Sequence, residues 1–161
     1  MKQFIFIGAY LLAIILANLV VASIGVSSVY VVAFILIGLD LTARDFLHEY
    51  WKKGKWWKLG LLIGVGSLIT WLLNKEAGMV AIASCAAFGS AAILDTISYQ
   101  VLQRKDYLIK VNGSNFISAF ADSFVFIAIA FGISWEVILL QYASKFAGGF
   151  IWSLILKKFR K

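Results

Sequence analysis

Ionisable side chains interrupt the apolar stretches of this 161-residue sequence at a few points, where they could do chemistry. Asp40, Arg44 and His48 follow one another at four-residue intervals, and Asp45 and Glu49 form a second ladder next to them. Residues four apart lie on one face of a helix. Because an arginine between carboxylates is a usual way of holding charge inside a protein, we expect Asp40 and Arg44 to be buried. All except His48 are candidate substrate contacts, although for Glu49 a position in water at the helix end is an equal alternative.

The polar residues between 114 and 122 form the sharpest pattern in the sequence. Ser114, Asn115, Ser118 and Asp122 fall within about 100° of one another on a helix. A polar stripe that ends in a carboxylate at membrane depth suits a ligand with several hydrogen-bond donors, so we assign the last three to a substrate site. The alternative is hydrogen bonding between helices, which is worth only about 0.6 kcal/mol per contact.

Two further segments carry polar side chains that could join this stripe. Asp95 and Tyr99 share one helix face, with Gln100 beside them, and these three residues are candidate substrate contacts. Lys145 is a natural neutralising partner for Asp122 or Asp95, and it is also assigned to the site. A buried ion pair without a substrate role is an equally good interpretation of the lysine.

Several kinds of chemistry find no support in these residues. A single histidine, His48, and a single cysteine, Cys85, cannot build a zinc site of the usual kind. The sequence has no glycine-rich phosphate loop of the Walker type and no nucleophile elbow of a serine hydrolase. We therefore expect no catalytic residue, no metal and no cofactor, and the chain is predicted not to be an enzyme.

The composition of the chain indicates that these polar side chains are carried by helices that cross a membrane. Hydrophobic residues make up 62% of the chain and charged residues only 14%, which is too little polar surface for a soluble domain of this size. A hydrocarbon core about 30 Å thick takes roughly 20 apolar residues per helix. The sequence therefore predicts an all-α integral membrane protein, a single domain over residues 1–161 with six transmembrane helices. The expected helices are residues 4–24, 29–51, 57–73, 79–102, 114–131 and 137–156.

The distribution of the net charge of +7 predicts how these helices are oriented. Twelve of the fifteen Lys and Arg residues lie at alternate ends of the apolar segments, including a loop expected at residues 104–113. The positive-inside rule then places both termini on the cytoplasmic side of the inner membrane. The basic excess favours contact with anionic lipid headgroups over nucleic acid. Two inverted halves of three helices, with a site at their interface, are a weaker alternative within this fold class.

In two charged segments the chain resembles the VUT family of vitamin uptake transporters. The family typically has a Thr/Asp-rich end of helix 2 that runs into Glu-Tyr and a basic loop. Here residues 41–45 read Leu-Thr-Ala-Arg-Asp and residues 49–50 read Glu-Tyr. The family also starts helix 5 with Ser-Asn or Arg-Ser, followed by an Asp-Ser pair and an aromatic residue. Residues 114–115 read Ser-Asn and residues 122–124 read Asp-Ser-Phe.

The resemblance implies a transporter that imports queuosine precursors, the deazaguanines preQ0 and preQ1, by alternating access. The site would lie between the faces of helices 2, 4 and 5. A flat deazapurine would offer N–H donors to Asp122 or Asp95 and a carbonyl group to Asn115. Arg44 and Glu49 would contact the base or act as a gate from the inner side.

Three other functions stay open at this point. The runner-up is the substrate-binding S-component of an energy-coupling-factor vitamin transporter, a small six-helix protein that needs partner ATPases. A membrane enzyme that acts on a lipid or prenyl substrate and a proton or ion channel are the others. Small residues in helices 4 and 6 also allow a homodimer without requiring one.

Overall fold

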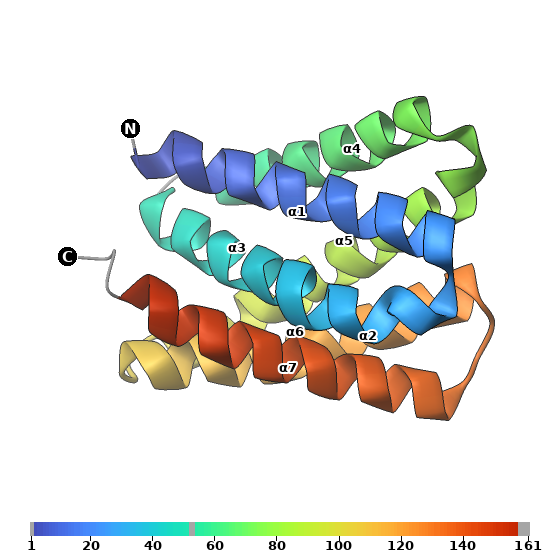
Figure 1. Cartoon of the computed structure of the whole chain (residues 1–161). Helices are drawn as coiled ribbons and strands as arrows, with labels where there is room; N and C mark the ends of the chain where they lie inside the picture. Colours follow the sequence, from blue (N-terminus) through green and yellow to red (C-terminus); the bar gives the residue numbers. More distant parts are fainter. Residues whose placement is uncertain (1, 52–53, 158–161) are drawn as a thin grey trace.

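The long apolar runs fold into long helices that lie roughly side by side (Figure 1). The structure is a computed structural model that describes residues 2–51 and 54–157, without the side chains of Lys2, Asp45, His48, Glu49, Lys55, Trp56 and Lys157. The elements are α1 (Lys2–Ile24), η1 (Val26–Ser28), α2 (Val29–Val32), η2 (Ala33–Ile37), α3 (Gly38–Tyr50), α4 (Lys55–Leu73), η3 (Lys75–Ala77), α5 (Gly78–Val101), α6 (Tyr107–Ala130) and α7 (Trp135–Lys157).

Five helical stretches in the described residues are long and apolar enough to cross a membrane, and the apolar part of α4, Trp57–Leu73, is shorter. The longest helices, such as α6, have 24 residues. At a rise of about 1.5 Å per residue they reach about 36 Å, which exceeds a hydrocarbon core of about 30 Å. The protein is therefore an all-α, multi-pass membrane protein of about six helices, as the sequence predicts.

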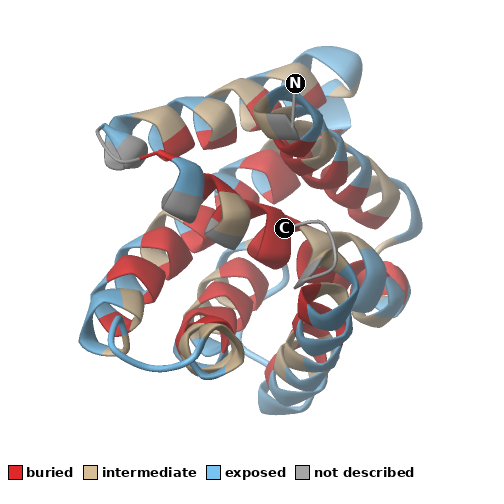
Figure 2. Cartoon of the chain, turned by 90° about the vertical axis from the view of Figure 1, so that its left-hand side faces the viewer, coloured by how far each residue is buried: buried red, intermediate tan, exposed pale blue. Residues whose placement is uncertain are grey.

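The helices form a closed ring. Around it, α1 packs against α3 and α4, α5 packs against α4 and α6, and α7 packs against α6 and the η2–α3 segment. Figure 2 shows the bundle from the end that holds both termini, with buried segments turned toward the interior and exposed ones outward. Large apolar side chains on the outer faces, including Leu61, Ile82 and Phe150, are exposed. In a membrane these side chains contact lipid.

The two ends of the bundle differ in the segments that they carry. Both termini, the α3–α4 turn and the α5–α6 turn lie at one end, which we call the basic end (Figure 1). There the ammonium group of Lys58 lies 5.4 Å from the centre of the Trp51 ring, a cation–π distance. At the opposite, far end, Lys75 lies 3.5 Å above the ring of Trp71. Such pairs of tryptophan and lysine are typical anchors at membrane surfaces.

The second membrane span is interrupted by a π-helical segment, η2, which lies between α2 and α3. A π-turn perturbs the regular hydrogen-bond ladder, and the Ile35 carbonyl in this turn accepts a bond of 3.0 Å from Nε1 of Trp152 on α7. The chain contains no proline. The break therefore does not come from a proline, and the side-chain hydrogen bond that accompanies it comes from a distant helix, α7.

Glycines let α7 approach this segment at backbone distance. A Cβ at Gly148 would overlap the carbonyl oxygen of Phe34, and a Cβ at Gly38 would lie 2.6 Å from the Gly148 carbonyl carbon. Thr42 Oγ1 donates to the Gly149 carbonyl oxygen over 3.3 Å. Small residues of this kind allow close helix contacts in lipid. The η2–α3 segment and α7 therefore form one tightly packed pair.

One expectation about the elements is wrong. Residues 104–113 do not form a loop, because α6 already begins at Tyr107. Lys110, which suggested a loop, instead lies on the helix and extends over the ring of Tyr99 at 4.8 Å. A long cationic side chain can continue a helix at a membrane surface because its charged end reaches toward water.

The two halves of the chain differ in helix order. In the first half α1 lies between α3 and α4, whereas in the second half α6 lies between α5 and α7. The arrangement of the ring thus gives no support to two repeated, inverted halves.

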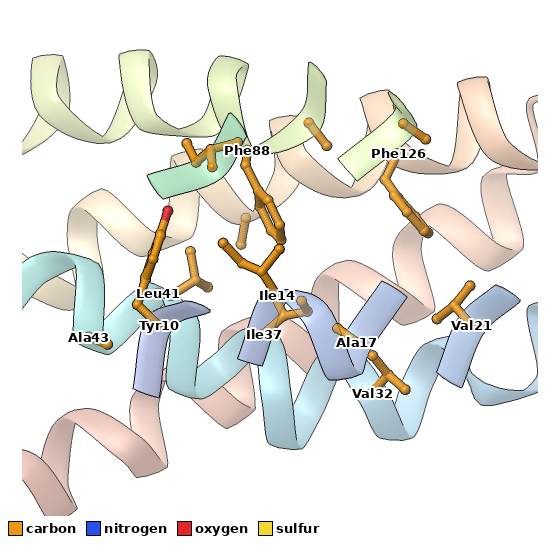
Figure 3. Packing of buried hydrophobic residues seen from close by; sticks show 14 of the residues in the cluster. Tyr10, Ile14, Ala17, Val21, Val32, Ile37, Leu41, Ala43, Phe88 and Phe126 are labelled. Atoms are coloured by element: carbon orange, nitrogen blue, oxygen red, sulfur yellow. The ribbon is translucent and has the colours of Figure 1, made fainter. Parts of the chain in front are cut away.

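Apolar packing fills the space between the helices. Figure 3 shows Tyr10 and Ile14 of α1, Leu41 of α3, Phe88 of α5 and Phe126 of α6 directed into this region. All of them belong to one cluster of buried residues, and Tyr10 is only 1% exposed. The charged side chains described next are therefore held in largely water-free surroundings.

Candidate functional site

Of the residues that the structure describes, five charged side chains are buried inside the bundle. They are Asp40 and Arg44 on α3, Asp95 on α5, Asp122 on α6 and Lys145 on α7, and each is at most 2% exposed. An ionisable group at membrane depth costs several kcal/mol, so such groups usually line a functional site. Four segments distant in sequence thus bring their charges into one interior region.

Lys145 and Asp122 form the shorter of two ion pairs, which we call the Lys145 pair. Lys145 Nζ donates to Asp122 Oδ2 over 2.7 Å. The sequence left Asp122 and Asp95 open as partners of the lysine, and the geometry selects Asp122. The ammonium group also lies 5.8 Å from the ring centre of Phe126. A buried carboxylate with a charge-assisted hydrogen bond is a strong acceptor that a ligand can compete for.

The Lys145 pair borders a small cavity of about 20 Å³. This is room for about one water molecule. Polar side chains line one part of the cavity, and apolar side chains such as Phe88 line the rest. The polar lining consists of Asn18, Ser84, Asp122, Gln141 and Lys145. Within the described part of the chain, Oε1 of Gln141 has no hydrogen-bond partner, so an acceptor is available at the cavity.

Three of these lining residues, Asn18, Ser84 and Gln141, were not assigned to the site from the sequence. Ser84 donates to Asn18 Oδ1, and Asn18 Nδ2 donates to Thr70 Oγ1 over 3.5 Å. These bonds join α1, α4 and α5 beside the cavity. Asn18 could have been found as the single strongly polar residue of the apolar stretch 4–24.

Arg44 and Asp95 form the second ion pair, which we call the Arg44 pair. Arg44 Nη2 lies 3.4 Å from Asp95 Oδ1 and donates to Ser118 Oγ over 3.3 Å. Ser118 precedes Asp122 by four residues, so α6 contacts the two pairs at points about 6 Å apart along its axis. The Arg44 pair lies toward the basic end, because Arg44 and Asp95 are each six residues from the end of their helix.

The polar stripe of α6 faces the interior, as its spacing predicts. Ser114, Asn115, Ser118 and Asp122 are all buried, whereas the neighbouring Phe116 is 54% exposed. Asn115 lies near Gly149 of α7, where a Cβ would be 3.7 Å from its Nδ2. The stripe therefore runs along the interface of α6 with α7 and reaches both ion pairs.

Asp40 differs from the other buried charged groups. Neither of its carboxyl oxygens has a hydrogen-bond partner among the described residues. The side chain is 0% exposed, and it lies within electrostatic range of Arg44, Asp122 and Lys145. Asp40 therefore belongs to the same cluster without taking part in either pair.

The remaining expected site residues lie elsewhere. Tyr99 is half-buried beneath Lys110 near the basic end. Gln100 is exposed on the outer face of α5, away from the buried charges. It follows Asp95 by five residues, which places the two side chains about 140° apart around the helix. The side chains of Asp45 and Glu49 lie outside the described part of the structure.

No group of three or more His, Cys, Asp or Glu residues within the described ranges could hold a metal ion. The acidic groups of the site are instead paired with basic side chains or lie singly. The arrangement suits recognition of a small polar molecule by hydrogen bonds and charge.

One comparison with known proteins identifies a family for this chain. A family model described as "Putative vitamin uptake transporter" matches residues 2–157, which is nearly the whole chain. Comparisons with curated proteins and with solved structures found no match. The predicted resemblance to the VUT family is thereby confirmed. The chain belongs to the family of vitamin uptake transporters, the VUT family.

Proposed function

We propose that this transporter imports a queuosine precursor, a 7-deazaguanine such as preQ0 or preQ1, by alternating access. Membership of the family indicates uptake of a small, vitamin-like molecule. The observation that carries the finer proposal is the Lys145 pair at the wall of a partly polar cavity inside the bundle. A carboxylate surrounded by amide groups and aromatic rings suits a flat base with a donor-rich edge.

The cavity offers complementary groups for such a base. Asp122 would accept two N–H groups of the guanine-like edge, and the amide of Gln141 or Asn18 would bind a remaining polar atom. Phe88 and Phe126 line the same cavity and would pack against the ring. Because the base would take the place of Lys145 at Asp122, its binding would release the lysine from the ion pair.

In this proposal the structure is a contracted form of the site. About 20 Å³ cannot hold a bicyclic base. The helices around it must therefore separate, and the interrupted second span with its close contact to α7 is the natural element to move. Parting of the Arg44 pair, one helical turn toward the basic end, would then open the path to that side.

We further propose that the basic end faces the cytoplasm and that the protein resides in the cytoplasmic membrane. Lys58, Arg104, Lys105 and Lys110 gather near this end, which the positive-inside rule places inside. The single domain would transport its cargo unchanged, without a cofactor and without a nucleic-acid partner. Two copies could associate through small-residue faces, but the proposed site lies within one chain.

The test is uptake of preQ0 and preQ1 by cells that lack both precursor synthesis and their own importer. Queuosine in tRNA is the output. Wild type is compared with Asp122→Asn and with Glu136→Gln, an exposed carboxylate at the start of α7 that serves as the matched control. Membrane expression of all three proteins is measured in parallel.

We expect wild type and Glu136→Gln to restore queuosine, and Asp122→Asn to lose at least about tenfold in uptake, because a loss of about 1.4 kcal/mol already has that effect. Failure of well-expressed wild type to restore queuosine would overturn the proposal of a transporter that acts alone. Restoration only in the presence of partner ATPases would identify an S-component of an energy-coupling-factor transporter instead.

A further inference from the structure

The buried charges of the bundle do not balance. Three carboxyl groups, Asp40, Asp95 and Asp122, face two cations, Arg44 and Lys145, within the described part of the interior. Asp95 and Asp122 are each within ion-pair distance of one cation. With all five groups ionised, the set has one excess negative charge. We assign it to Asp40, because the other two carboxylates are each paired with a cation.

The surroundings of Asp40 offer this charge no hydrogen bond. Both of its oxygens are buried and lack a hydrogen-bond partner in the described part of the protein. The titratable and charged groups around it are Tyr10 of α1, Arg44 of its own helix, Asp122 of α6 and Lys145 of α7. Asp95 of α5 lies beyond Arg44. Both cations in this set already contact another carboxylate.

A buried carboxylate without hydrogen bonds is costly, by several kcal/mol even after the protein relaxes. A residue that served only to fill space could be apolar at no such cost. The cost is recovered if a positive charge reaches Asp40 during the transport cycle. Release of Lys145 from Asp122 by the base, as proposed above, would leave the same excess of one negative charge.

We propose that Asp40 is the counter-charge for one positive charge that crosses the membrane with each molecule of cargo. The inference rests on the proposed function and adds that each transport event moves one positive charge. The positive charge can have two sources: an ammonium group on the cargo itself, or a proton that accompanies a neutral cargo. The aminomethyl group of preQ1 is of the first kind, whereas the nitrile of preQ0 carries no charge and belongs to the second.

The experiment compares these two compounds in vesicles that contain the purified protein. Uptake of radiolabelled preQ1 and preQ0 is measured with an inside-negative membrane potential, with an inward proton gradient, and with neither. In wild type we expect the inside-negative potential to drive both compounds, because each enters with one positive charge, and the proton gradient to drive preQ0 but not preQ1. In Asp40→Asn, we expect preQ1 uptake to fall about tenfold and preQ0 uptake to lose its response to the gradient.

Asp106→Asn is the matched control, because Asp106 is an exposed carboxylate in the turn before α6. It should behave like wild type in every condition. Thermal unfolding of each variant establishes that it is folded before uptake is measured. The inference is overturned if Asp40→Asn keeps the wild-type responses to potential and proton gradient, or if it slows both compounds equally in all conditions.

A second measurement separates this inference from the identity of the cargo. If wild type takes up neither deazaguanine, the proposed function fails. The role of Asp40 is then tested by the binding of two simpler compounds that differ mainly in charge. Thermal shifts of purified protein are measured with 3-(aminomethyl)indole and indole-3-carbonitrile, which differ in charge and lack the guanine edge. A larger shift by the amine that disappears in Asp40→Asn supports the inference. Equal shifts, or no shift with either compound, overturn it.

Discussion

The Lys145 pair and the Arg44 pair each join an aspartate to a buried cation, and they contact α6 about one helical turn apart, but their surroundings differ. The Lys145 pair is short, at 2.7 Å between charged atoms, and lines a cavity. The Arg44 pair is longer, at 3.4 Å, and its arginine also donates to Ser118. Neither member of the Arg44 pair lines that cavity. One pair is thus placed to exchange partners with a ligand, and the other to join three helices.

The choice of cation fits this difference. Lysine is a point charge on a flexible stem, and when it is buried alone it can become neutral by losing its proton. Arginine keeps its charge in proteins and holds several acceptors in a fixed plane. A lysine is therefore suited to leave its carboxylate when cargo binds, whereas an arginine is suited to fasten α3, α5 and α6 together in the contracted form, before the path to the basic end opens.

The largest expected effect concerns the Arg44 pair. Replacing Asp95 by Asn removes the carboxylate next to a buried guanidinium group that stays charged, and breaking such a pair costs about 3–5 kcal/mol. We expect Asp95→Asn to lower the thermal stability of the purified protein and its yield in the membrane. Asp122→Asn, the corresponding change in the Lys145 pair, should lose uptake while keeping most of the stability.

This prediction is checked by thermal unfolding of both variants in the same detergent, alongside wild type. Equal losses of stability in the two variants would remove the distinction between a fastening pair and a binding pair. A stable Asp95→Asn protein with wild-type uptake would show that the Arg44 pair neither stabilises the bundle nor takes part in transport.

A smaller effect is expected where α7 meets the second span. An added methyl group at Gly148 would overlap the Phe34 carbonyl oxygen, whereas at Gly149 it would meet only ordinary contacts at 3.7–3.8 Å. Overpacking of this kind typically costs about 1–3 kcal/mol. We expect Gly148→Ala to reduce both stability and uptake and Gly149→Ala, the neighbouring control, to resemble wild type. Uptake and unfolding temperature of the two variants measure the difference, and two equal variants would contradict the role of this contact.

The smallest effect is expected at Ser118, the residue of α6 that contacts the Arg44 pair one turn before Asp122. Ser118→Ala removes one long hydrogen bond, 3.3 Å, from an Arg44 guanidinium group that keeps Asp95 as a partner, so we expect a loss near the typical net value of about 0.5–1.5 kcal/mol. Because Asp122 stays in place, the affinity for cargo should change little while stability falls slightly. A large loss of affinity in binding measurements would instead make Ser118 a direct contact of the cargo.

The parts of the site that the sequence predicts are those that follow from the period of one helix. The spacing of Ser114, Asn115, Ser118 and Asp122 places them on one face, and all four are buried. The length of each apolar stretch likewise predicts a membrane span without any knowledge of the other helices. Gln100 shows how narrow this rule is, because one residue beyond the four-residue spacing already turns its side chain outward.

Contacts between helices could not be read from periodicity. Asn18 and Ser84 are 66 residues apart, and only the ring order of the helices brings them together at the cavity. The π-helical turn at η2 depends on its packing against Gly148 and Trp152, which no local pattern encodes. The sequence likewise allows either Asp122 or Asp95 as the partner of Lys145, and only the packing of α6 against α7 selects Asp122.

The central claim is that Asp122, in the Lys145 pair, binds the base. Equilibrium binding of radiolabelled preQ1 and preQ0 to purified protein tests it most directly, with wild type, Asp122→Asn and the exposed control Glu136→Gln. We expect wild type and the control to bind at least one of the two compounds with equal affinity, and Asp122→Asn to bind it at least about tenfold more weakly. Wild-type affinity in a folded Asp122→Asn protein would contradict the site, and no binding by wild type would contradict the cargo.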